Sequence, residues 1–96
     1  MNQIGQETLT VGATAESLTV PTGSHPKRVL IYIGGQPVRW RADGTAPTAT
    51  AGMYVAAGSY IDWTELATYT SLVDRVQFIR DTAAGGDATL EIAYFD

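Results

Sequence analysis

The residues that could perform chemistry are few, and His25 is the only histidine of the chain. It lies between Ser24 and Pro26, in a stretch whose two prolines and glycine indicate a loop. A Ser-His-Asp triad needs a histidine that holds the serine hydroxyl and is itself oriented by a carboxylate. Two neighbours in sequence do not give that geometry, so an exposed loop histidine is the better interpretation. We expect no catalytic residue and no enzymatic activity.

The sequence evidence for a metal site or a phosphate site is equally weak. Asp81 and Asp87 flank a glycine-containing run, but calcium sites use carboxylates that are spaced more closely. A flexible hairpin connection is the expected structure there. Gly34-Gly35 is followed by neither the lysine nor the helix start of a phosphate-binding loop. Cysteine is absent, which excludes disulfides and thiolate ligands. We therefore expect no metal and no other cofactor.

The arginines are the stronger candidates for function, because the chain has five of them and a single lysine. Arginine is the cation that protein interfaces favour. The alternative is a solvated sheet face on which each arginine pairs with an acid of the neighbouring strand. Isolated sheets protect their edges with lysine, so its scarcity favours edges that other subunits cover. The interface candidates are Arg39, Arg41, Arg75 and Arg80.

Composition limits the classes of protein that fit. A chain of 96 residues with 45% hydrophobic residues makes one folded domain. Its net charge of -4 lacks the basic footprint of a nucleic-acid-binding protein. The sequence contains neither a run of about 18 apolar residues nor an N-terminal export signal, so we expect a soluble protein without a membrane partner.

Short stretches of alternating apolar and polar residues recur at roughly ten-residue intervals, with glycine and proline between them. This spacing predicts an all-β fold, a small antiparallel β-sandwich of about seven or eight short strands, of which a jelly roll is one version. Residues 1–20 are expected to be an N-terminal strand or arm, and residues 21–96 the sandwich domain. The expected strands are Glu7–Val11, Ser17–Val20, Arg28–Ile33, Val38–Arg41, Met53–Val55, Tyr60–Trp63, Arg75–Arg80 and Thr89–Phe95.

Three pairs of consecutive strands are expected to form hairpins. Arg28–Ile33, the most apolar run, is predicted to be central and to pair with the Val38–Arg41 strand. The Met53 and Tyr60 strands are predicted to turn at Ala57-Gly58, and the last two strands to pair through the run from Asp81 to Asp87. Thr64–Leu72 is expected to be a loop. The predicted core consists of Val29, Ile31, Ile33, Val38, Trp40, Ile61, Val76, Phe78, Leu90, Ile92 and Tyr94.

Two long stretches, GGQPVRWRADGTAPTATAGMYVAAGSYI and VQFIRDTAAGGDATLEIAYF, resemble a group of small proteins encoded by tailed bacteriophages, often beside the head genes. The resemblance covers Val29 to Ile61 and Val76 to Phe95. It lies in RWR followed by DGT and PT, in G-x-x-x-A-A-G, and in the FIR strand with its glycine-containing turn and alternating last strand. The first twenty residues and the insert from Trp63 to Asp74 lie outside it.

The resemblance implies a virion structural protein, a decoration or cement subunit on the capsid surface that is made in the host cytoplasm. Its expected partners are the major capsid protein and further copies of itself, with a trimer favoured. A different class of function is a glycan-recognising module of a tail or head fibre. Exposed aromatic residues that could stack on sugar rings motivate it, the candidates being Tyr54, Tyr60, Trp63 and Tyr69. Core packing is the alternative for each of these aromatics.

Overall fold

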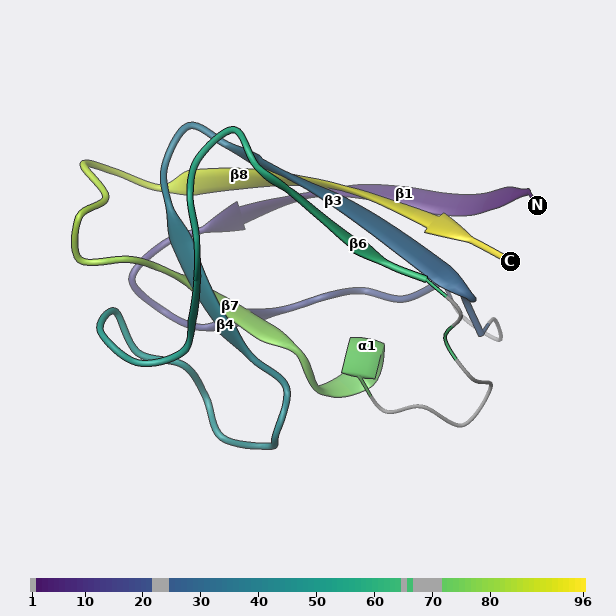
Figure 1. Cartoon of the computed structure of the whole chain (residues 1–96), viewed down its shortest axis with the longest axis horizontal. Helices are drawn as coiled ribbons and strands as arrows, with labels where there is room; N and C mark the ends of the chain where they lie inside the picture. The colour runs from purple at the N-terminus through teal and green to yellow at the C-terminus, as the bar shows by residue number, and fades with distance from the viewer. Residues whose placement is uncertain (1, 22–24, 65, 67–71) are drawn as a thin grey trace.

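Two four-stranded antiparallel sheets pack face to face in a computed structural model that describes residues 2–21, 25–64, 66 and 72–96 (Figure 1). Sheet A has the strand order β1-β8-β3-β6, and sheet B has the order β2-β7-β4-β5. The strands of sheet A are β1 (Gln3–Val11), β8 (Ala88–Phe95), β3 (Arg28–Gly34) and β6 (Tyr60–Trp63). Those of sheet B are β2 (Glu16–Ser17), β7 (Gln77–Arg80), β4 (Val38–Arg41) and β5 (Met53–Val55).

The strand pairing is nested. β1 pairs with β8, β2 with β7, β3 with β6 and β4 with β5, all antiparallel. Each of these four pairs is a two-stranded ribbon. Further pairing of β8 with β3 and of β7 with β4 joins the four ribbons into the two sheets. A double-stranded ribbon wound in this way is the jelly-roll topology. The predicted all-β sandwich is therefore confirmed, in the jelly-roll version.

The three predicted hairpins are wrong. β3 and β4 lie in different sheets, as do β5 and β6, and as do β7 and β8. The prediction assumed that strands joined by a short, glycine-containing loop lie side by side. Instead, both strands of each pair carry an apolar face, and the loop brings these faces together across the sandwich. Val38 of β4 and Ile31 of β3 accordingly belong to one hydrophobic cluster.

The core lies between the sheets and consists mainly of β-branched residues and two large aromatic side chains. Nine of the eleven predicted core residues are buried, namely Val29, Ile31, Ile33, Val38, Val76, Phe78, Leu90, Ile92 and Tyr94. Trp40 and Ile61 are half-buried and pack against this cluster. Trp40 meets Trp63 edge to face with ring centroids 5.3 Å apart, which joins β4 to β6 across the sandwich.

The first strand is an integral part of sheet A. β1 follows β8 in register from Gln3 to Val11, with one irregularity near Gly5. Glu7 faces Ile92 and therefore points into the sandwich. Its carboxylate accepts hydrogen bonds from the Tyr94 hydroxyl and the Thr19 amide. An inward-pointing charge on an edge strand opposes pairing with other chains.

The segment before β7 differs from its expected form. The expected strand from Arg75 to Arg80 begins only at Gln77, because Leu72–Arg75 forms one helical turn, α1. The expected loop from Thr64 to Leu72 lies largely outside the described residues. No helix in the described part of the chain is long and apolar enough to cross a membrane.

Candidate functional site

The four arginines proposed for an interface do not share one surface. Arg39 and Arg41 alternate with Trp40 on β4 and point away from the core. Arg80 is opposite Val38 in the register of β7 and β4, so it lies on the other face of sheet B. Arg75 ends α1 and lies against the turn at Gly44.

Three of these arginines bind carboxylates of the chain's own loops. The guanidinium–carboxylate distances are 2.5 Å for Arg39–Asp81, 2.5 Å for Arg41–Asp43 and 3.0 Å for Arg80–Asp87. Arg28 on β3 makes a fourth pair with Asp62 on β6, at 2.9 Å. Pairing within the chain leaves less of each guanidinium for another molecule. An interface role for these arginines stays a prediction.

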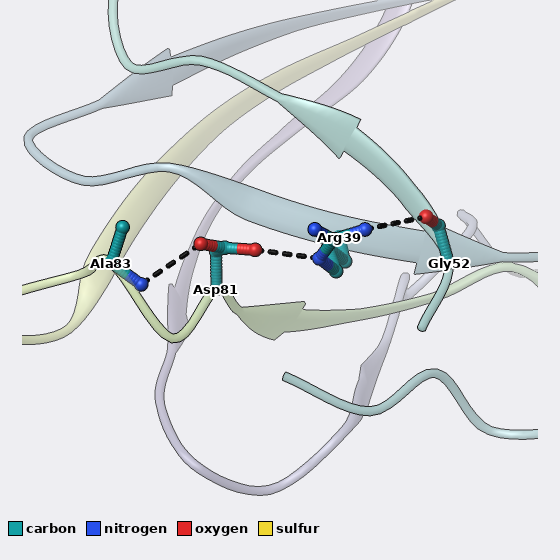
Figure 2. A network of polar contacts seen from close by, with 4 residues as sticks. All are labelled: Arg39, Gly52, Asp81 and Ala83. Atoms are coloured by element: carbon teal, nitrogen blue, oxygen red, sulfur yellow. Dashed lines mark hydrogen bonds and ion pairs between the residues drawn. The ribbon is translucent and has the colours of Figure 1, made fainter. Parts of the chain in front are cut away.

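Among the ion pairs of the described residues, the most enclosed is that between Arg39 and Asp81, which Figure 2 shows with its two backbone partners. Asp81 directly follows β7 and is only 5% exposed. One carboxylate oxygen accepts from the Arg39 Nε, and the other accepts from the Ala83 amide at 2.8 Å. Arg39 Nη1 reaches the Gly52 carbonyl at 3.0 Å. The network thus joins β4 to the loops before β5 and after β7.

Backbone hydrogen bonds continue this connection at the same end of the sandwich. The Asp81 amide donates to the Pro37 carbonyl and the Thr82 amide donates to the Ala49 carbonyl, each at 3.1 Å. Three separate connections, those from β3 to β4, from β4 to β5 and from β7 to β8, are therefore fastened together. The run after Asp81 was expected to be a flexible hairpin, whereas it is a tethered crossover between the sheets.

The network makes stability dependent on pH. The Ala83 amide and then the Arg39 guanidinium lower the pKa of Asp81 from its ordinary value of 3.8. A lowered pKa in the folded state contributes stability above the unfolded pKa, and this is lost as the pH falls through the folded value. We expect Asp81→Asn to lose less stability than the natural chain between pH 7 and about pH 3, as measured by urea unfolding at both values.

The matched control is Asp74→Asn, because Asp74 is exposed and forms no ion pair with the described residues. Between pH 7 and about pH 3, this variant should lose as much free energy of unfolding as the natural chain. If Asp81→Asn loses as much free energy of unfolding on acidification as the control does, Asp81 is not the source of this pH dependence.

A second feature is a hollow on the outer face of sheet A, which we call the tyrosine hollow. It has a volume of about 180 Å³, and its lining includes Gln6, Leu30, Tyr32, Tyr60, Glu91 and Ala93. The strand registers explain this grouping, since Tyr32 lies between Glu91 and Tyr60, and Ala93 lies between Gln6 and Leu30. The small Ala93 side chain, flanked by longer ones, leaves the space open.

Of the aromatic residues proposed to stack on sugars, Tyr60 lines this hollow and is 65% exposed. Tyr54 is exposed on β5, Trp63 is half-buried against Trp40, and Tyr69 lies outside the described residues. Sequence reasoning missed Tyr32, because its strand was interpreted as a nearly continuous apolar run. The alternation of Ile31, Tyr32 and Ile33 was the available signal, since it places Tyr32 opposite the core.

Within the described ranges, no group of three or more His, Cys, Asp or Glu residues is placed to hold a metal ion. Comparison of the chain with protein-family models, curated proteins and solved structures finds no match. The resemblance to small phage proteins therefore rests on the sequence motifs, and the candidate sites rest on geometry.

Proposed function

We propose that the chain is a non-enzymatic structural protein of a tailed-phage virion, a decoration subunit that binds the major capsid protein and stabilises the head. It acts as a homo-oligomer, with a trimer favoured, on the capsid surface, after synthesis in the host cytoplasm. The sequence motifs from Val29 to Ile61 and from Val76 to Phe95 motivate the phage context. The exposure of residues on strand β5 supports the proposed docking side.

The observation that carries the proposal is the exposed edge of strand β5. Met53 is opposite Trp40 and Tyr54 is opposite Arg39 in the register with β4, so their side chains lie on the two faces of this edge, and both are largely exposed. Among the described residues, β5 pairs only with β4. A hollow of about 300 Å³ is lined by Met53, Gly52 and residues 40–43. Tyrosine, methionine and arginine are enriched in protein interfaces, and exposed apolar patches indicate binding surfaces. We call this the β5 side.

The fold and its loops are compatible with such a role. Jelly rolls build viral capsid proteins, but also lectins, so the architecture supports the proposal only by analogy. The Arg39–Asp81 network gives a more specific argument, because it fixes β4 and the loop that leads to β5. A surface held in place before binding loses less conformational entropy when it docks.

The test measures binding of the purified protein to capsids that lack it. The double variant Met53→Ser with Tyr54→Ser should bind at least about tenfold more weakly, because a few side chains, tyrosine often among them, carry most of the binding energy of an interface at about 2 kcal/mol or more each. Glu16→Gln, on the edge strand at the opposite side of sheet B, is the control and should bind normally. Thermal melting of both proteins checks that they are folded.

Absence of the protein from purified virions by mass spectrometry, together with no binding to capsids, would contradict the proposal. The solution mass tests the expected trimer separately. The alternative function, a glycan- or fibre-binding module, is favoured by the exposure of Tyr60 beside the tyrosine hollow. Binding of sugars at that hollow would support this alternative.

A further inference from the structure

We propose that the tyrosine hollow binds the guanidinium group of an arginine side chain that a partner protein presents. The inference deepens the proposed function by naming the chemistry of a second docking point. It rests on the proposed function only for the identity of the protein that supplies the arginine. The site lies on sheet A and is separate from the β5 side on sheet B.

The size of the hollow suits the end of one side chain. Ala93 and Leu30 lie side by side on β8 and β3, and Gln6 of β1 flanks Ala93 on its other side. Tyr32 and Glu91 form the adjoining row of side chains. The volume of about 180 Å³ corresponds to roughly six water molecules, so the hollow takes the end of one side chain.

The aromatic wall offers ring faces to a cation. The Tyr32 and Tyr60 rings are in contact, with centroids 5.1 Å apart and planes inclined by 52°. No group fits between rings at this distance, so a ligand lies over them. Tyr32 is 37% exposed and Tyr60 is more exposed still. The negative face of a tyrosine ring attracts a guanidinium within about 6 Å of its centroid.

Glu91 supplies the charge. Its Oε2 accepts a hydrogen bond from the Thr8 hydroxyl at 2.9 Å, which orients the carboxylate. In the described part of the structure, Glu91 forms no ion pair. The neighbouring Arg28 and Asp62 neutralise each other, so the carboxylate of Glu91 gives the hollow an uncompensated negative charge. The net charge of -4 also favours a cationic ligand.

The chain fills two similar sites with its own arginines. Arg28 lies 5.4 Å from the Phe95 ring centroid while it binds the Asp62 carboxylate. Arg39 lies 5.6 Å from the Tyr54 ring centroid while it binds the Asp81 carboxylate.

The tyrosine hollow has the same two components, aromatic rings and a carboxylate, and Tyr32 is directly opposite Glu91 in the strand register. Among the described residues, no arginine occupies it. A guanidinium can stack on a ring and donate to a carboxylate at the same time, because it is planar and carries its donors in that plane. An incoming arginine therefore fits better than a neutral sugar, which leaves the charge of Glu91 uncompensated.

The test is an NMR titration of the isolated, isotopically labelled chain with N-acetyl-arginine methylamide. N-acetyl-citrulline methylamide, which has a similar shape and no charge, is the matched probe. We expect saturable shifts of the Tyr32, Tyr60, Glu91 and Ala93 amides with the arginine probe, and at least fivefold weaker binding of the citrulline probe. Glu91→Gln should weaken arginine binding at least fivefold, and Tyr60→Ala should weaken it as well.

Glu16→Gln, which removes a carboxylate from sheet B, should leave the arginine titration unchanged. Equal binding of the two probes, or no effect of Glu91→Gln in a protein with normal melting, would overturn the proposal. Stronger shifts of the same amides by methyl glucoside would also overturn it and assign the hollow to glycans. Because the titration contains no capsid, it can fail while capsid binding through the β5 side succeeds, and the reverse holds too.

Discussion

Replacing Tyr94 with alanine is expected to lower the free energy of unfolding by about 4 kcal/mol. Tyr94 is the largest fully buried side chain among the described residues, and it lies on β8, which pairs with both β1 and β3. Its removal leaves a cavity in the core, on the inner face of sheet A near the end of β8, which the surrounding strands can fill only in part. Urea unfolding of the two proteins at neutral pH measures the difference.

Tyr94→Phe separates the hydroxyl from the ring. Burial, and then the hydrogen bond to Glu7, raise the pKa of Tyr94, so the hydroxyl remains a donor at neutral pH. The phenylalanine variant keeps the packing but removes this donor from Glu7, at an expected cost of about 1 kcal/mol. If Tyr94→Ala lowers the free energy of unfolding no more than Tyr94→Phe does, the Tyr94 ring is not tightly packed in the core.

Gly52→Ala is expected to lower the free energy of unfolding by about 3 kcal/mol. Gly52 has a φ of +132°, a backbone conformation that residues with a side chain rarely adopt. An added Cβ would lie 3.0 Å from the Trp40 carbonyl oxygen and 3.4 Å from the Arg39 Cβ. Because the Gly52 carbonyl also accepts from Arg39, a shift of the backbone would disturb the network that holds Asp81.

The control for this substitution is Gly58→Ala in the turn between β5 and β6. Gly58 has a φ of +84°, and nothing lies within 4 Å of an added Cβ, so its cost is that of the left-handed conformation alone, about 1 kcal/mol. Urea unfolding of both variants compares the two costs. Equal losses would show that the contacts of Gly52 with β4 carry no additional energy.

The sequence predicted the strands well because their signal is local. The alternation of Val29, Ile31 and Ile33 marks the buried face of β3 without knowledge of its neighbours. The pairing partners were predicted wrongly because an apolar face fits equally well beside a strand or across from it. The nested jelly-roll order depends on packing between distant parts of the chain, which periodicity does not encode.

The candidate sites show the same limit. Arginines can be found in a sequence, but whether Arg39 binds Asp81 or a partner depends on a loop that returns to β4 from far along the chain. The tyrosine hollow could not be predicted from sequence, because all four strands of sheet A contribute residues to its lining.

The nested strand pairing also bears on the order of folding. Arg39 donates a hydrogen bond to the Gly52 carbonyl beside the β4–β5 pair, and these residues are 13 apart in the sequence. Thr8 and Glu91, which are bonded between β1 and β8, are 83 apart. Closing the shorter loop costs less entropy, and folds dominated by distant pairings form slowly. The chain is therefore expected to close from β4 and β5 outward, with β1 docking on β8 last. The Thr8 hydroxyl that orients Glu91 would reach it only in that final step.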